Sequence, residues 1–121
     1  MMERKRDYKE LHEVCSRLGR RPRFPVYLGQ ELIETPIEEL ELSVRSFNCL
    51  RRAGMATVGD LVLNINTRED LLKIRNLGMR SADEIMNAIM EYQFSILSEG
   101  ARKKYLDRIK ELNSREHVDN T

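Results

Sequence analysis

Two segments of this 121-residue chain share one pattern of residue types, and the pattern is suited to holding an anion. Each has glycine, methionine, a variable residue, a hydroxyl residue, two further residues, an acidic residue and an aliphatic one. The copies are Gly54–Leu61 and Gly78–Ile85. A glycine lets the backbone approach a ligand closely, and the first N–H groups of a following helix attract phosphate. We therefore predict two helix-hairpin-helix units of the kind that hold a nucleic-acid backbone.

The two copies differ in charge. The second has Arg80 directly before its hydroxyl residue, whereas the first has Ala56 at that position. An arginine can neutralise a phosphate that the backbone N–H groups bind. We therefore expect the second hairpin to contact nucleic acid and the first to serve as scaffold.

Hydroxyl residues that can cap a first helical turn mark the predicted helix starts: Thr35, Ser43, Thr57, Thr67 and Ser81. At the first of these, Pro36 and Glu38 complete a predicted capping box before a short turn through Leu40. The helix from Ser43 should end near Gly54. The helix from Ser81 is longer, with an apolar face through Ile96.

The two ends of the chain are also predicted to be helical. Apolar residues recur at helical spacing over 7–18, and Gly19 should end that helix. Two prolines then predict an extended connector over 20–29. Near the other end, residues 105–112 predict one more helix, followed by a polar, frayed tail from Asn113.

No segment has the pattern of a β-strand, so we predict an all-α fold, a compact bundle of short helices. We expect three parts. Residues 1–34 form a basic amphipathic helix and an extended connector. Residues 35–97 form the domain with the helix-hairpin-helix units, and residues 98–121 form a C-terminal helix and polar tail.

The formal net charge of +1 averages over segments of opposite sign. Residues 1–23 hold eight Lys and Arg against four Asp and Glu, residues 31–42 hold five Glu, and residues 43–56 hold three Arg and no acidic residue. A positive face on a nearly neutral protein follows from this distribution. For residues 1–23, a merely solvated helix surface explains the charges equally well.

Composition argues against several classes of protein. No apolar run approaches the roughly 20 residues of a membrane span, and the charged start is unlike a signal peptide, so we expect a cytoplasmic protein with no membrane partner. The two cysteines and two histidines are too scattered for a metal site or a disulfide framework. We expect no cofactor, no metal and no enzymatic activity.

One region resembles a known family. It comprises Pro36–Leu50 together with Val58–Val62, Leu71–Lys73 and Asn76–Ser81, and its core phrase is Glu-Leu-Ser-Val-Arg-Ser-Phe-Asn-Cys-Leu at 41–50. Over roughly residues 33–95, the sequence is similar to the C-terminal domain of the bacterial RNA polymerase alpha subunit. The resemblance implies a compact helical domain that binds the minor groove of A/T-rich promoter DNA and touches transcription activators.

The resemblance also implies a set of DNA-contacting residues in the helix after Ser43 and at the second hairpin. With Arg51 of the same helix included, the predicted DNA-binding residues are Arg45, Asn48, Cys49, Arg51, Asn76, Gly78, Arg80, Ser81 and Glu84.

The spacing of these residues agrees with this role. Arg45, Asn48 and Cys49 lie three and four positions apart, hence on one helical face. An arginine gains from the enhanced negative potential of a narrow A/T minor groove, and asparagine offers both a donor and an acceptor.

Structural roles compete with some of these assignments. Ser81 and Glu84 could simply form a capping box, and Cys49 could be a small buried core residue without a nearby histidine to activate it.

The sequence departs from the family pattern at several positions. Arg80 stands where lysine is more common, and Met79 replaces a commonly basic residue, which should weaken the phosphate contribution. Met79 could instead fill the core or touch a partner. Phe47 stands where a small residue is usual, and the segment 63–70 looks about two residues longer than in the family.

The polymerase subunit's large assembly domain is absent, so the protein is either an excised fragment or, as we expect, a small independent protein. The leading hypothesis is a non-enzymatic protein that binds double-stranded, A/T-rich DNA in bacterial transcription. The alternative is an adaptor for RNA polymerase, a sigma factor or an activator, with weak or no DNA binding. A more distant possibility is a helix-hairpin-helix accessory factor in DNA repair or replication.

Overall fold

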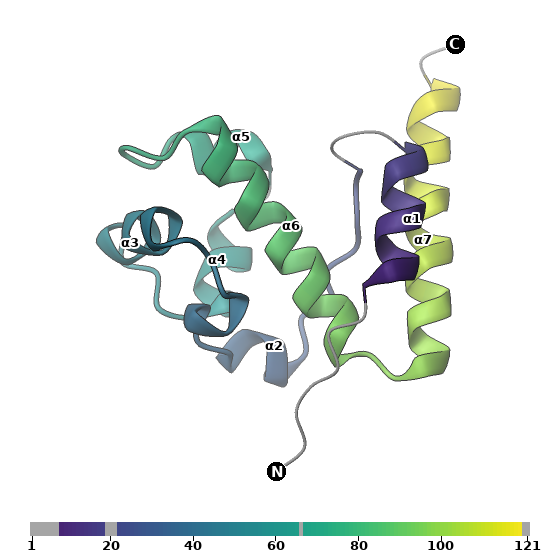
Figure 1. Cartoon of the computed structure of the whole chain (residues 1–121), viewed down its shortest axis with the longest axis horizontal. Coiled ribbons are helices and arrows are strands. Elements are labelled where there is room, and N and C mark those ends of the chain that lie inside the picture. The colour runs from purple at the N-terminus through teal and green to yellow at the C-terminus, as the bar shows by residue number, and fades with distance from the viewer. Residues whose placement is uncertain (1–7, 19–21, 66, 120–121) are drawn as a thin grey trace. The chain divides into compact units, whose positions relative to one another are not determined.

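The computed structural model describes residues 8–18, 22–65 and 67–119 (Figure 1). Within these ranges every regular element is helical, which confirms the predicted all-α fold. The elements are α1 (Lys9–Leu18), α2 (Gln30–Glu34), the 3-10 helix η1 (Ile37–Leu40), α3 (Val44–Arg52), α4 (Val58–Asn64), α5 (Arg68–Leu72), α6 (Met79–Ile96) and α7 (Glu99–Asp119). None of these helices has the length and apolar character needed to cross a membrane.

The protein divides into two compact units. One is the continuous stretch 26–90, and the other combines the segment up to Pro25 with the segment from Glu91 onward. The unit 26–90 contains α2 to α5 and most of α6. Its core consists of fully or nearly fully buried aliphatic side chains: Leu32, Ile37, Leu40, Leu50, Val58, Leu61, Leu71, Leu77, Ile85 and Ile89.

Three of the predicted helix starts in this unit are confirmed by their caps. The hydroxyl of Ser43 accepts a hydrogen bond from the Ser46 N–H, at 3.3 Å. Thr57 and Thr67 each form a complete capping box, with Asp60 and Asp70 as the reciprocal acceptors. These local hydrogen bonds satisfy N–H groups that the first turn of a helix leaves without partners. They fix where α3, α4 and α5 begin.

The predicted capping box at Thr35 is wrong. Thr35 follows α2, a helix that the sequence pattern did not indicate, and its hydroxyl donates to the carbonyl of Glu31 at 2.5 Å. The next helical turn, η1, begins after Pro36 without a side-chain cap. The five-residue α2 is too short to be stable alone and forms because it packs against α4.

The two copies of the repeated pattern adopt different backbone geometries. In the first, Gly54 follows α3 with a φ of 85°, as expected for a glycine that ends a helix. In the second, the left-handed residue is Asn76, with a φ of 66°, and Gly78 stands at the start of α6. The Gly78 carbonyl accepts from the Ala82 N–H at 3.0 Å, so α6 begins after Gly78, three residues before the predicted capping residue Ser81.

In the other unit, α1 packs against α7. Tyr105 and Ile109 of α7 and Leu11 of α1 are fully buried. The side chain of Asn113 bonds both backbone groups of Arg23, at 2.9 Å each. The helix continues past Asn113 to Asp119, so the prediction of a frayed tail from Asn113 is wrong. The predicted end of the first helix at Gly19 lies outside the described residues.

Candidate nucleic-acid interface

One face of α3 presents two polar side chains to solvent. Arg45 and Asn48 are both exposed, and α3 has no acidic residue in its first turn that would compete for the arginine. Cys49, one residue further on, is only 5% exposed. The face predicted from the spacing is therefore present. Arg45 and Asn48 are exposed to solvent on it, and Cys49 is buried beside them.

The turn before α6 provides a second exposed segment. Asn76, Gly78 and Arg80 are all exposed, whereas Ser81 is 9% exposed and lies in the first turn of α6. No heavy atom lies within 4 Å of the position that a Cβ would take on Gly78. The backbone here is open to a ligand, and the first-turn N–H groups of α6 carry the positive end of an 18-residue helix.

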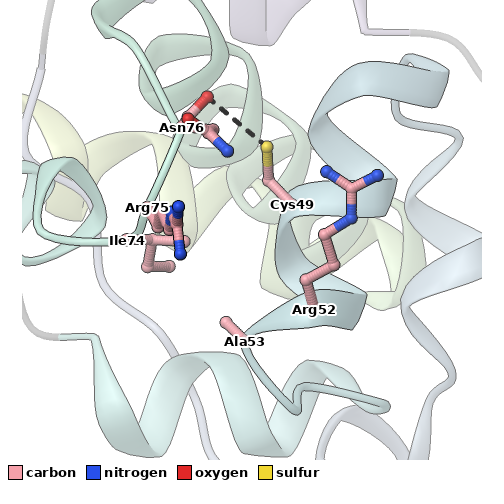
Figure 2. A pocket seen from close by; sticks show the side chains of 6 residues that line it. All are labelled: Cys49, Arg52, Ala53, Ile74, Arg75 and Asn76. Atoms are coloured by element: carbon pink, nitrogen blue, oxygen red, sulfur yellow. Dashed lines mark hydrogen bonds between the residues drawn. The ribbon is translucent and has the colours of Figure 1, made fainter.

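Hydrogen bonds tie these two segments together at two places. The Cys49 thiol donates to the carbonyl of Asn76 across 3.5 Å (Figure 2). Glu84 of α6 accepts from the Ser43 N–H at 2.6 Å, from the Ser43 hydroxyl at 2.9 Å and from the Ser46 hydroxyl at 2.5 Å. The middle of α3 and its N-terminus are therefore both anchored to the segment that carries Asn76, Gly78 and Arg80.

These bonds correct the interpretation of Ser81 and Glu84 as a capping box. Glu84 supplies the acidic group at the N-terminus of α3 rather than at the start of its own helix. Its partial burial raises the pKa of the carboxyl group, but the hydrogen bonds from Ser46 and Ser43 outweigh that effect and leave the pKa below its ordinary value. The charged form of Glu84 is therefore the one that the folded state favours.

Replacing Glu84 with glutamine should lower the free energy of unfolding near neutral pH, because the new amide group would face N–H and O–H donors. A carboxyl with a depressed folded pKa contributes stability above its unfolded pKa, near 4.3, and loses it as pH falls through the folded value. The difference between wild type and Glu84→Gln should therefore shrink below about pH 4. Urea unfolding at several pH values measures this difference in unfolding free energy. Glu39→Gln, at an exposed glutamate, is the control. A difference that does not change with pH would contradict the role of the charge.

The structure separates Arg51 from the other predicted residues. Its guanidinium lies 3.7 Å from the carboxylate of Glu38 and 5.6 Å from the centre of the Phe47 ring. Six positions after Arg45, it is about 120° away around the helix. Arg51 thus packs against Glu38 and Phe47 and away from Arg45, although it stands only three positions from Asn48.

Two arginines near the predicted site were not singled out from the sequence. Arg52 and Arg75 line a hollow of about 420 Å³ together with Cys49, Ala53, Ile74 and Asn76 (Figure 2). Arg52 stands seven positions after Arg45, nearly two full turns, so helical spacing already indicated the shared face. No sequence spacing could place Arg75 opposite it, because the hollow joins α3 to a turn more than twenty residues later in the sequence.

In the described part of the protein, no group of three His, Cys, Asp or Glu side chains is arranged to hold a metal ion.

Comparison with known proteins identifies the family. The model of one family, described as the C-terminal domain of the alpha subunit of bacterial RNA polymerase, matches residues 28–91, which is more than half of the sequence. These residues include α2 to α5 and the start of α6, and hence every side chain of the candidate interface.

Similar proteins include DNA-directed RNA polymerase alpha subunits from several bacteria. The protein of Rubrobacter xylanophilus is 52% identical over 65 residues, covering 54% of this chain and 20% of the relative. That of Carboxydothermus hydrogenoformans is 46% identical over 70 residues, covering 58% and 22%. The chain thus spans about a fifth of the length of these relatives. On the match of the family model, the chain belongs to the family of bacterial RNA polymerase alpha C-terminal domains.

Proposed function

We propose that this protein is a non-catalytic DNA-binding module of bacterial transcription, which binds the minor groove of A/T-rich DNA. Membership of the family supports the general part, a role in transcription with DNA binding. The arrangement of α3 and the start of α6 supports the specific part, which is binding in the minor groove and a preference for A/T-rich DNA.

The observation that carries the proposal is the pair Arg45 and Asn48, exposed on one face of α3 and held beside an open backbone turn. Arginine is favoured in a narrow A/T minor groove because the negative potential is strongest there. Asparagine can donate to and accept from the base edges and sugar oxygens that the minor groove exposes. Together the two side chains would sense groove width more than the identity of each base.

The turn at Asn76 to Arg80 would bind the backbone that borders the groove. The open position at Gly78 leaves room for a phosphate, the first-turn N–H groups of α6 can donate to it, and Arg80 can neutralise its charge. Cys49 and Glu84 would act as positioning residues, since their hydrogen bonds hold α3 against this turn. Ser81 lies in the same first turn but is only 9% exposed, so little of its side chain could reach DNA.

Binding to an A/T-tract duplex and to a G/C duplex of equal length tests the proposal, with fluorescence anisotropy over a salt series. We expect tighter binding to the A/T duplex. The logarithm of affinity should fall with the logarithm of salt concentration, by about 0.9 for each phosphate contact. An affinity that is indifferent to salt, or equal for both duplexes, would overturn the proposed mechanism.

A second candidate is a protein-binding adaptor. Val44 and Met79, at the starts of α3 and α6, are 76% and 58% exposed, and such apolar side chains favour contact with a protein surface. Under this alternative the protein would bind RNA polymerase or a regulator with little affinity for DNA. Absence of binding to both duplexes, together with binding to purified polymerase, would favour it.

A further inference from the structure

The charged side chains of the unit 26–90 show an uneven pattern of pairing. This unit has seven Lys and Arg against ten Asp and Glu, so acidic partners are plentiful. Arg51, Arg68 and Lys73 each form an ion pair, with Glu38, Asp83 and Asp70 respectively. The side chains of the remaining four cations have no ion pair or hydrogen bond with any residue that the structure describes: Arg45, Arg52, Arg75 and Arg80.

Two of these four, Arg45 and Arg80, belong to the interface proposed above. The other two line one hollow, with Arg52 on the last turn of α3 and Arg75 on the segment before Asn76 (Figure 2). No carboxylate is among the residues that line this hollow. Two guanidinium groups around one cavity repel each other unless an anion lies between them, and a planar guanidinium matches phosphate oxygens well.

The position of the hollow relative to Arg45 indicates which anion it would take. Arg52 lies about 10 Å further along the same face of α3, since each residue adds about 1.5 Å. The minor groove is only about 6 Å wide. With Arg45 in the groove and α3 crossing it, Arg52 would lie beyond the groove edge, at the sugar-phosphate backbone.

We infer that the hollow is a phosphate-binding subsite, in which Arg52 and Arg75 together contact the DNA backbone that borders the bound minor groove. The inference rests on the proposed function. Ile74 and Ala53 provide apolar surface beside the two guanidinium groups, and both arginines are exposed and so accessible to a DNA phosphate. The subsite would add affinity without sequence preference, because phosphates are the same at every step of the duplex.

The double variant Arg52→Gln/Arg75→Gln tests the subsite by the same anisotropy titrations. Loss of two phosphate contacts should make the salt slope shallower by about 2 and weaken binding to A/T and G/C duplexes by the same factor. The control is Lys73→Gln, which removes a charge that is paired with Asp70 outside the hollow and should leave the slope nearly unchanged.

Two further measurements separate the alternatives. Arg52 ends α3, where a cation also favours the helix dipole, so a purely structural role predicts a lower melting temperature with an unchanged salt slope. An unchanged slope in the double variant would overturn the subsite, while loss of binding in Arg45→Ala would still support the proposed function. A wild-type protein that binds neither duplex would overturn both.

Discussion

Replacing Arg45 with alanine is expected to remove most of the affinity for an A/T-tract duplex while leaving the melting temperature nearly unchanged. The side chain is exposed and forms no ion pair within the described part of the protein, so its loss costs the fold little. A charged hydrogen bond at a desolvated interface contributes about 1.5–3 kcal/mol. Affinity should therefore fall roughly 10- to 100-fold.

Anisotropy at low salt measures this loss, and thermal unfolding followed by far-ultraviolet circular dichroism checks the fold. Arg51→Ala is the matched control, because it removes the same charge from the same helix on the side that faces Glu38 and Phe47. Equal losses in the two variants would indicate a non-specific effect of net charge. Binding that survives Arg45→Ala would show that α3 does not enter the groove in the proposed way.

Replacing Gly59 with alanine is expected to cause the largest loss of stability. Gly59 lies in α4, buried against α2, and a Cβ there would stand 2.5 Å from the Ile33 carbonyl oxygen, 2.8 Å from Ile33 Cγ2 and 3.0 Å from Ile33 Cα. The backbone of α2 cannot move away freely, because the Thr35 carbonyl accepts from the Val58 N–H at 2.6 Å. Overpacking of this kind costs about 1–3 kcal/mol, against a gain of up to about 1 kcal/mol in helix propensity.

Urea unfolding of wild type and Gly59→Ala gives the difference in unfolding free energy. Gly100→Ala is a suitable control, since this glycine lies in the first turn of α7 and no heavy atom is within 4 Å of its Cβ position. The control should be neutral or slightly stabilising. If both variants unfold at the same urea concentration, α2 moves away from the added methyl group at little cost and the expected overpacking is wrong.

Some helices of the structure could be predicted from residues that are close in sequence, and others could not. The caps at Ser43, Thr57 and Thr67 were predictable because each involves residues within three positions of one another, so the hydrogen bonds are local. Helix α2 was not predictable in this way. It exists because Gly59 of α4, more than twenty residues later, lets two backbones come together.

At the repeated pattern the sequence predicted a similarity that the structure does not have. Gly54 and Gly78 have matching neighbours in sequence, yet the left-handed residue is Gly54 in one copy and Asn76 in the other. At the second copy the turn also contacts α3, because the Asn76 carbonyl accepts a hydrogen bond from the Cys49 thiol. Similar residue types therefore led to an incorrect helix start at Ser81.

The sequence by itself determined the helical class, the family and the face of α3 that carries Arg45 and Asn48, because helical spacing and local caps depend on near neighbours. Tertiary structure alone decided which acidic group caps α3, where Glu84 acts from another helix, and which cations remain unpaired. It also decided that Arg52 and Arg75 line one hollow. Such pairings join residues far apart in the sequence, and only packing of the core brings them within contact distance.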